Sequence, residues 1–214
     1  MRIDKWDRIR AVAVYCGSRT PENPVYTAGA VRLGRFLAEH GMTLVFGGSN
    51  TGTMKSVADA VLENGGRAVG VFPAEFPRTL LHPGLNESVI AADLAERKRL
   101  MLDRADVCVA LPGSFGTWDE LFDALALRKI RAGHVKPVGV LNIDGYFDAL
   151  LAFIRHSVET GFTSARHAGL LKAAPTPELL FRRLAGSLVL SGENNGTEEE
   201  CGNRTVPNVN QKPE

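Results

Sequence analysis

The chain has 214 residues, of which 44% are hydrophobic and 23% are charged, and this composition suits one α/β domain with a sizeable core. Its formal net charge of +1 argues against nucleic acid or an anionic membrane as the main partner. No apolar run approaches the roughly 20 residues of a membrane span, and the charged N-terminus predicts no secretion signal.

Short apolar runs alternate with amphipathic stretches. Continuous apolar runs are typical of strands buried on both faces, and apolar residues three or four apart predict helices. In chain order the pattern predicts strand 11–16, helix 24–40, strand 43–46, helix 52–64, strand 68–72, helix 93–105, strand 107–111, helix 117–131, strand 138–141, helix 146–160 and helix 177–184.

This alternation predicts a doubly wound, mostly parallel sheet with helices on both faces, a Rossmann-like α/β fold. We expect a single catalytic domain over residues 1–190. Residues 191–214 are rich in Asn, Gly, Glu, Pro and Thr, and we expect them to form a disordered polar tail.

Three predicted strands end in glycine-bearing turns: Gly17 and Ser18 follow the first, Gly47 and Gly48 the second, and Gly113 the fourth. Ligands of such sheets bind at the carboxyl ends of the strands. None of the turns has the G-x-G-x-x-G spacing, so no nicotinamide or flavin site is predicted. Turns in α/β proteins often contain glycine in any case, but three in register favour a binding site.

The segment from Pro112 to Glu120 is the most informative stretch of the chain. Gly113 and Gly116 would let the backbone approach an anion, and the first N–H groups of the following helix would point at it. Glu120 lies away from the apolar stripe of that helix, so we do not expect it in the core. A carboxylate beside a phosphate site indicates chemistry on a phosphorylated small molecule.

The helix predicted over 93–105 carries two cations in unusual places. Lys98 falls inside its apolar stripe and Arg97 lies at the edge of that stripe. One interpretation is that their stems pack on the core while the charges reach water. The alternative is that both cations point at an anion or at a carboxylate in a cleft.

No metal site is predicted, because the five histidines show no ligand spacing with Cys, Asp or Glu. Each histidine is expected at the surface or at a helix cap. The three cysteines, Cys16, Cys108 and Cys201, are far apart and odd in number. Cys16 and Cys108 sit in apolar strand patterns, where buried, reduced thiols are the usual interpretation. A reducing, cytoplasmic setting fits best.

These motifs resemble those of the LOG ("lonely guy") family, the cytokinin riboside 5′-monophosphate phosphoribohydrolases that were long mislabelled as lysine decarboxylases. The resemblance covers residues 13–162. Its most specific parts are Arg97-Lys98 and Gly116-Thr117-x-x-Glu120. Other matching stretches include Tyr15-Cys16-Gly17-Ser18, Leu44-Val45-Phe46-Gly47-Gly48, Ala110-Leu111-Pro112-Gly113 and Lys136-Pro137-Val138-Gly139.

The resemblance implies hydrolysis of the N-glycosidic bond of a nucleoside 5′-monophosphate to a free base and ribose 5-phosphate. It implies no metal or redox cofactor, and a homodimer. Arg97 and Glu120 would be the catalytic pair, and the loop 113–117 would hold the 5′-phosphate. The expected substrate-binding residues are Gly17, Ser18, Gly47, Gly48, Lys98, Gly113, Ser114, Phe115, Gly116, Thr117 and Asp119.

This chemistry suits those residue types. Breaking the bond between ribose and base builds positive charge on the sugar, which a carboxylate can stabilise while it orients the attacking water. Arg97 would either fix the phosphoribosyl group or hold Glu120 ionised and oriented. The sequence does not decide between these two roles.

The chain departs from the family pattern at Ser49, Lys55 and Ser114, where glycine is usual, and at Thr79 and Ala126 on the side of the base. Two alternatives therefore stay open. The chain would carry out the same chemistry on another base, or it would be a non-catalytic carrier of a phosphorylated ligand such as molybdenum cofactor. Residues 121–130 would supply an apolar dimer face, although core packing explains them equally well.

Overall fold

The computed structural model describes residues 6–130 and 136–193. Its strands form one sheet in the order β4-β3-β2-β1-β5-β6-β7, and each neighbouring pair is parallel. The predicted doubly wound fold is therefore confirmed. The strands are β1 (Ala11–Tyr15), β2 (Thr43–Phe46), β3 (Ala68–Pro73), β4 (Glu87–Ala91), β5 (Val107–Ala110), β6 (Val138–Leu141) and β7 (Leu171–Ala174).

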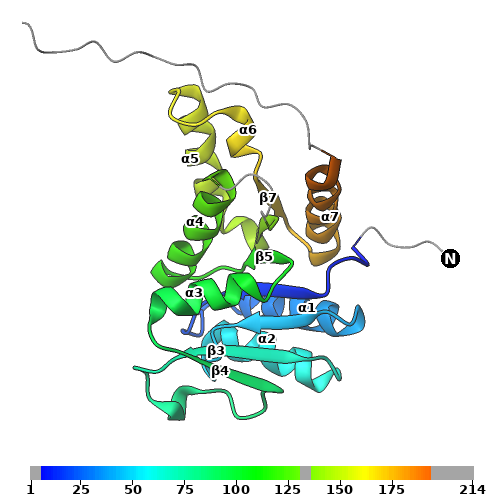
Figure 1. Ribbon diagram of the computed structural model, residues 1–214, viewed down its shortest axis with the longest axis vertical. Coiled ribbons are helices and arrows are strands. Elements are labelled where there is room, and N and C mark those ends of the chain that lie inside the picture. Colours follow the sequence, from blue (N-terminus) through cyan, green and yellow to red (C-terminus); the bar gives the residue numbers. More distant parts are fainter. Residues whose placement is uncertain (1–5, 131–135, 194–214) are drawn as a thin grey trace, which may run out of the picture.

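Helices cover both faces of this sheet, with β4 at the bottom of the view in Figure 1 and β7 towards the top. One core lies between the sheet and α1, α2 and α7; the other lies between the sheet and α3, α4 and the start of α5. The helices are α1 (Pro24–Glu39), α2 (Gly52–Glu63), α3 (Leu94–Asp103), α4 (Phe115–Ile130), α5 (Asp148–Glu159), α6 (Ala165–Ala168) and α7 (Pro177–Glu193), with short 3-10 turns η1 (Arg78–Leu80) and η2 (Ile143–Gly145).

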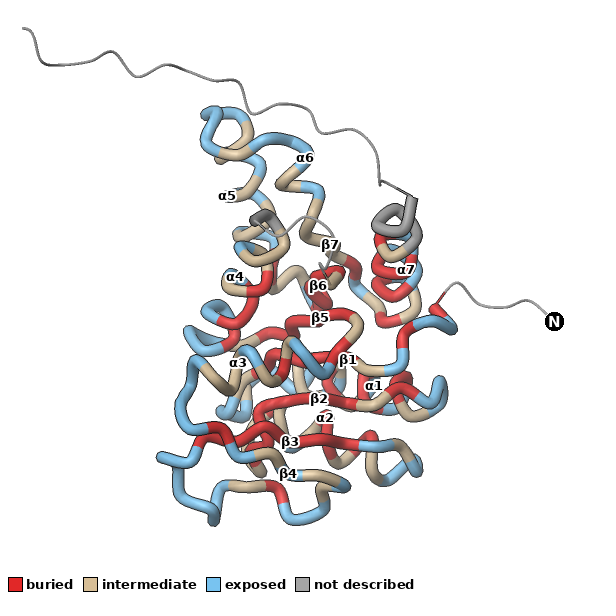
Figure 2. The backbone as a smooth tube through the Cα atoms, in the orientation of Figure 1, coloured by how far each residue is buried: buried red, intermediate tan, exposed pale blue. Residues whose placement is uncertain are grey.

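The central strands are apolar because their side chains alternate between the two cores. In β1, Val12 and Val14 pack towards α1 and α2, whereas Ala13 and Tyr15 pack towards α3 and α4. The central strands are accordingly buried along their length, as Figure 2 shows. Among the described residues, no helix is both long and apolar enough to span a membrane.

The sequence pattern missed β4, β7 and α6. The two strands lie at the edges of the sheet, where one row of backbone groups has no neighbouring strand. In β4 every second residue is exposed, and β7 contains Lys172, so neither reads as a continuous apolar run. Helix α6 has only four residues, too few for a periodic pattern.

The C-terminal helix is longer than expected. Helix α7 continues to Glu193, beyond the predicted helix end at residue 184 and the expected domain boundary at residue 190. Most of the expected tail, residues 194–214, lies outside the described residues, as do residues 1–5 and 131–135.

Strand order locates the crevice of the sheet. From β1 the chain moves through β2 and β3 to the β4 edge, and then returns to β5 on the other side of β1. The turns after β1 and β5 consequently lead away from each other. Ligands of doubly wound sheets bind at such a switch point, outside the carboxyl ends of the strands.

Candidate active site

Three glycine-bearing turns meet at the carboxyl edge of the sheet because β2, β1 and β5 are neighbours. The turns after β1 and β5 are in contact: a Cβ added to Gly17 would lie 3.7 Å from Cα of Gly113. The clustering predicted from the sequence is thus present, and its centre is the switch point.

An ion pair between Arg97 of α3 and Glu120 of α4 lies at this edge. Nη1 of Arg97 is 2.9 Å from Oε1 of Glu120, and the two side chains are only 14% and 6% exposed. The Nε of Arg97 donates a hydrogen bond to the carbonyl oxygen of Val71 on β3, at 3.2 Å. Arg97 therefore points at a carboxylate, which was one of the alternatives for the cations of this helix.

The start of α3 and the turn after β2 determine where Arg97 lies. Asp93 caps α3 by accepting a hydrogen bond from the N–H of Glu96, whose carboxylate accepts one from Ala92. Arg97 follows in the first turn and runs across Gly47. A Cβ at position 47 would lie 1.9 Å from Nη2 of Arg97, so any other residue there would displace the guanidinium from this position.

Glu120 is buried, and the expectation that it lies outside the core was wrong. Its position on α4 is off the apolar stripe, but Arg97 on another helix covers it. Burial raises the pKa of the Glu120 carboxyl to about 7. The charge of Arg97 opposes this effect and favours the ionised form, whereas Asp119 raises the pKa and Lys98 lowers it.

Two buried polar atoms on the first turns of α4 have no hydrogen-bond partner among the described residues: Oε1 of Glu120 and Oγ1 of Thr117. The contact of Oε1 with Arg97 meets the distance of an ion pair but not the geometry of a hydrogen bond. Buried polar groups normally have a partner. A water molecule or substrate hydroxyl at this place would provide one.

The loop before α4 suits an anion. The N–H of Trp118 donates to the carbonyl oxygen of Ser114, which starts the helix. The N–H groups of residues 115–117 precede the first intrahelical bond and are the ones that an N-terminus offers to a phosphate. A Cβ at Gly116 would meet no atom within 4 Å, whereas one at Gly113 would lie 2.1 Å from Oγ1 of Thr117.

A second ion pair runs beside the first. Nζ of Lys98 lies 3.0 Å from Oδ1 of Asp119, and the aspartate is largely exposed. Because residues 97 and 98 on α3 pair with residues 120 and 119 on α4, the two helices are joined by adjacent charges of opposite sign. Lys98 is therefore paired with a carboxylate rather than merely extended into solvent.

Not every predicted substrate-binding residue contacts the Arg97–Glu120 pair. The N–H and the carbonyl of Gly17 are both hydrogen-bonded to Thr53 at the start of α2, and Ser18 beside it is exposed. Gly48 turns away from Arg97: its carbonyl accepts from the N–H of His82, and its Cα packs against Gly70. Gly48 therefore supports the neighbouring segments at Gly70 and His82.

Tyr146 contacts the loop before α4, although the sequence pattern places it only at the start of a helix predicted over 146–160. Its hydroxyl donates a hydrogen bond to the carbonyl of Gly113. The turn that brings Tyr146 there contains Asp144 in the left-handed region, at φ 50°, followed by Gly145. The Asp144-Gly145 pair signals the turn, but nothing local in the sequence signals a contact with residue 113.

The positions that depart from the family pattern lie mostly around this centre rather than in it. Ser49 bonds to Thr51, Lys55 pairs with Asp59 on α2, and Thr79 lies exposed in η1. His82 is buried and contacts Asp59 at 3.0 Å, so the expectation that every histidine lies at the surface or at a cap was wrong. Ala126 lines a groove beside α4.

Two thiols near the site are buried and free. Burial is the main cause that raises the pKa of both thiols, that of Cys108 to about 11. The nearby charge of Glu120 raises the pKa of the Cys16 thiol further. Both are protonated near neutral pH, which makes them packing residues and not nucleophiles.

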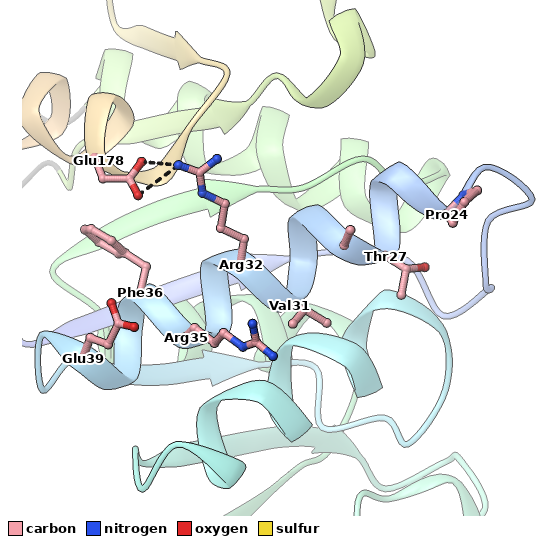
Figure 3. Close-up of a pocket in the computed structure, with 9 residues that line it drawn as sticks. Pro24, Thr27, Val31, Arg32, Arg35, Phe36, Glu39 and Glu178 are labelled. Carbon is pink, nitrogen blue, oxygen red and sulfur yellow. Dashed lines mark hydrogen bonds and ion pairs between the residues drawn. The ribbon is translucent and has the colours of Figure 1, made fainter.

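A separate groove lies away from this site. A groove of about 680 Å³ runs along the outer side of α1, and Figure 3 shows Arg32 and Glu178 meeting across it. One nitrogen of Arg32 lies 3.1 and 3.0 Å from the two carboxylate oxygens of Glu178. The charges of Arg32 and Glu178 thus neutralise each other within the protein. A smaller cavity of about 240 Å³ lies between the turns after β1 and β5, at the switch point.

Comparison with known proteins gives this centre a context. The family described as "Possible lysine decarboxylase" matches residues 54–184. The probable cytokinin riboside 5′-monophosphate phosphoribohydrolase LOGL5 of Oryza sativa subsp. japonica is 42% identical, over 83% of this chain and 72% of that protein. The phosphoribohydrolase LOG7 of Arabidopsis thaliana is 37% identical, over 83% of this chain and 82% of that protein.

Solved structures share the fold. The structural-genomics target TM1055 is 28% identical, with a TM-score of 0.61, over 85% of this chain and 98% of that one. The molybdenum cofactor binding protein of Rippkaea orientalis has a TM-score of 0.59 over 85% of this chain and 96% of that one. Its identity is only 22%, so this likeness shows the fold alone.

The two glycines of the loop before α4 should respond differently to replacement. Gly113→Ala forces a carbon against Thr117, and overpacking of this kind costs about 1–3 kcal/mol. We expect its melting temperature to fall by roughly 3–10 °C. Gly116→Ala places its carbon in open space, so its melting temperature should stay within about 2 °C of the wild type.

Calorimetry with ribose 5-phosphate separates the two effects further. Gly116→Ala should bind this anion about tenfold more weakly, because the added methyl group lies where a phosphate would approach the helix. If Gly116→Ala bound as the wild type does, the loop would not be the phosphate site.

Proposed function

Since the chain belongs to the LOG family of phosphoribohydrolases, we propose that it hydrolyses the N-glycosidic bond of a nucleoside 5′-monophosphate, releasing a free base and ribose 5-phosphate. The observation that carries the proposal is the buried Arg97–Glu120 pair beside the anion-binding loop of α4. Its two residues are those that the family motifs single out.

The reaction needs a nucleophile and a way to tolerate positive charge on the sugar. As the bond between C1′ and the base nitrogen breaks, its electron pair leaves with the base, and C1′ becomes electron-deficient. The carboxylate of Glu120 stabilises this charge and accepts a hydrogen bond from the attacking water. The water oxygen then bonds to C1′, and its proton is released for transfer to the departing base.

Arg97 acts on Glu120 in this proposal. A carboxyl group so deeply buried would otherwise hold its proton at neutral pH, and the adjacent guanidinium favours the anion. The contacts of Arg97 with Glu120 and Val71 support the role of holding Glu120 ionised and oriented.

The 5′-phosphate would lie on the N–H groups at the start of α4, which places the ribose between the loop and Glu120. Lys98, which is held by its ion pair with Asp119, adds a positive charge beside the phosphoribosyl group. The remaining residues of the loop, Ser114 to Thr117, complete the phosphate site.

The residues expected on the side of the base depart further from the family pattern than those expected around the phosphoribosyl group. Thr79 and Ala126 replace residues that the family pattern places on the base side, and Thr79 is exposed in η1. We propose AMP-like nucleotides or cytokinin riboside 5′-monophosphates as substrates, with another base as the alternative. The names of the curated relatives support the cytokinin type.

A carrier of molybdenum cofactor is the other candidate. It rests on solved structures that are 22% identical to this chain, and this level of likeness shows the fold alone. A carrier has no need of a buried carboxyl group whose ionised form is favoured by an adjacent guanidinium. The Arg97–Glu120 pair therefore favours the hydrolase.

We also propose a cytoplasmic homodimer joined through α4 and α5. Helix α5 contains Leu150, Leu151 and Ile154 but has no buried residue, and in Figure 2 it is drawn in the colours of intermediate and exposed residues. Phe122 and Phe153 are 46% and 64% exposed and line an apolar groove of about 380 Å³. A second copy would cover this face. The cytoplasmic part of this proposal rests on the free thiols of Cys16 and Cys108, because buried free thiols suit a reducing compartment.

Replacement of Glu120 by Gln tests the reaction. Glu120→Gln keeps the size of the side chain but cannot carry negative charge, and we expect kcat to fall at least about a hundredfold. Released base is measured by chromatography with AMP, N6-isopentenyl-AMP, GMP, CMP and UMP. Glu178→Gln removes a paired carboxylate on the opposite side and should leave kcat unchanged. Hydrolysis by Glu120→Gln at a near-normal rate would exclude the assigned role.

A single charge on the apolar face tests the dimer. Light scattering should give the wild type twice the mass of one chain, and Phe153→Asp should shift it to the mass of one chain, because a carboxylate cannot be buried unpaired in an interface. Leu179→Asp on α7 is the control and should leave the mass unchanged. A wild type with the mass of a single chain would contradict the proposal.

A further inference from the structure

The cavity at the switch point has an unusual charge. The turn after β1 contributes Gly17, Arg19 and Pro21 to its wall, and the turn after β5 contributes Pro112, Gly113 and Ser114. Tyr26, Thr53 and Tyr146 complete it. Of the residues that line this cavity, Arg19 alone carries a charge. A positive charge without an acidic residue in the same wall favours an anion as the occupant.

Arg19 has no carboxylate of its own. Within residues 6–130 and 136–193 it makes no ion pair, hydrogen bond or ring contact. The contrast with the groove on α1 is clear, because there Arg32 is bound to Glu178 (Figure 3). The guanidinium of Arg19 is therefore available to a ligand.

The backbone beneath Arg19 is fixed, although its side chain is exposed. Gly52 at the start of α2 packs directly against the Ser18–Arg19 peptide: a Cβ there would lie 2.6 Å from the nitrogen of Arg19. Thr53 holds Gly17, two residues before Arg19, by two hydrogen bonds of 3.0 and 3.1 Å. Arg19 thus projects from a rigid point on one side of the cavity, which limits the entropy lost when it binds.

The opposite wall of the cavity is the start of the anion-binding loop. Tyr146 donates a hydrogen bond to the carbonyl of Gly113, and its ring packs edge-on against Tyr26 at 5.6 Å. The Gly113 carbonyl is thereby turned toward Tyr146. In a trans peptide the N–H of Ser114 points to the side opposite the carbonyl oxygen of Gly113. A phosphate that accepts a hydrogen bond from this N–H therefore does not face the Gly113 oxygen.

We propose that Arg19 binds the 5′-phosphate of the substrate from the side opposite the N-terminus of α4, and that it sets the preference for nucleotides over nucleosides. This inference rests on the proposed hydrolase, and it assigns a residue outside the motifs of the family. The buried, unpartnered hydroxyl of Thr117 marks the helix side of the same site. A guanidinium suits a phosphate because its N–H groups match two phosphate oxygens.

Replacement of Arg19 should weaken phosphate binding without changing the chemistry. We expect Arg19→Gln to raise KM for the nucleotide about tenfold and to change kcat less than about threefold, since the residue contacts a group remote from C1′. The KM of Arg19→Lys should lie between that of the wild type and that of Arg19→Gln. Arg35→Gln is the matched control: Arg35 is also exposed and points away from the Arg32–Glu178 pair, as Figure 3 shows.

Binding is measured separately by calorimetry with ribose 5-phosphate, which does not depend on turnover. Its affinity should fall about tenfold in Arg19→Gln and stay unchanged in Arg35→Gln. Equal affinity in the wild type and Arg19→Gln overturns the inference, whether or not the enzyme hydrolyses nucleotides. Binding that depends on Arg19, without any hydrolysis, supports this phosphate contact and overturns the hydrolase only.

Inorganic phosphate is the second probe. Binding of inorganic phosphate that depends on Arg19, with no binding of ribose 5-phosphate, would assign the cavity to a free anion and overturn the inference. Parallel loss of both anions in Arg19→Gln is the result that we expect.

Discussion

The burial of one carboxylate organises this site. Glu120 lies under Arg97 at the edge of the sheet, where loss of water raises its pKa to about 7 and the guanidinium favours its ionised form. A buried charge is tolerated only when it is paired. The glycine at position 47, the hydrogen bond to Val71 and the cap of α3 all serve to bring Arg97 to that place.

The topology of the sheet provides the cavity in which we propose that the phosphate binds. Because β1 and β5 are neighbours whose turns lead apart, a cavity opens between Gly17 and Gly113, beside the N-terminus of α4. The ion pair and the anion-binding loop share the first turns of one helix. In the proposed function, a phosphoribosyl group held at its phosphate would present C1′ toward the carboxylate of Glu120, so that binding energy is used for orientation.

Much of this could be predicted from the sequence. Strands buried on both faces give continuous apolar runs, and the Arg97-Lys98 and Gly116–Glu120 motifs name the central residues. The edge strands β4 and β7 could not be found this way, because β4 begins with the polar residues Glu87 and Ser88 and Lys172 interrupts the apolar pattern of β7. The burial of Glu120 and the bond from Tyr146 to Gly113 depend on partners distant in the chain, which no local pattern records.

The most direct test of the account is the titration of Glu120 by carbon NMR, with its carboxyl signal assigned from Glu120→Gln. In the wild type the signal should titrate with a pKa near 7, because burial outweighs the charge of Arg97. In Arg97→Gln it should titrate at higher pH, because the favourable charge is removed while the burial stays. A Glu120 that titrates at the ordinary value of 4.5, or whose pKa does not respond to the loss of Arg97, would contradict the account.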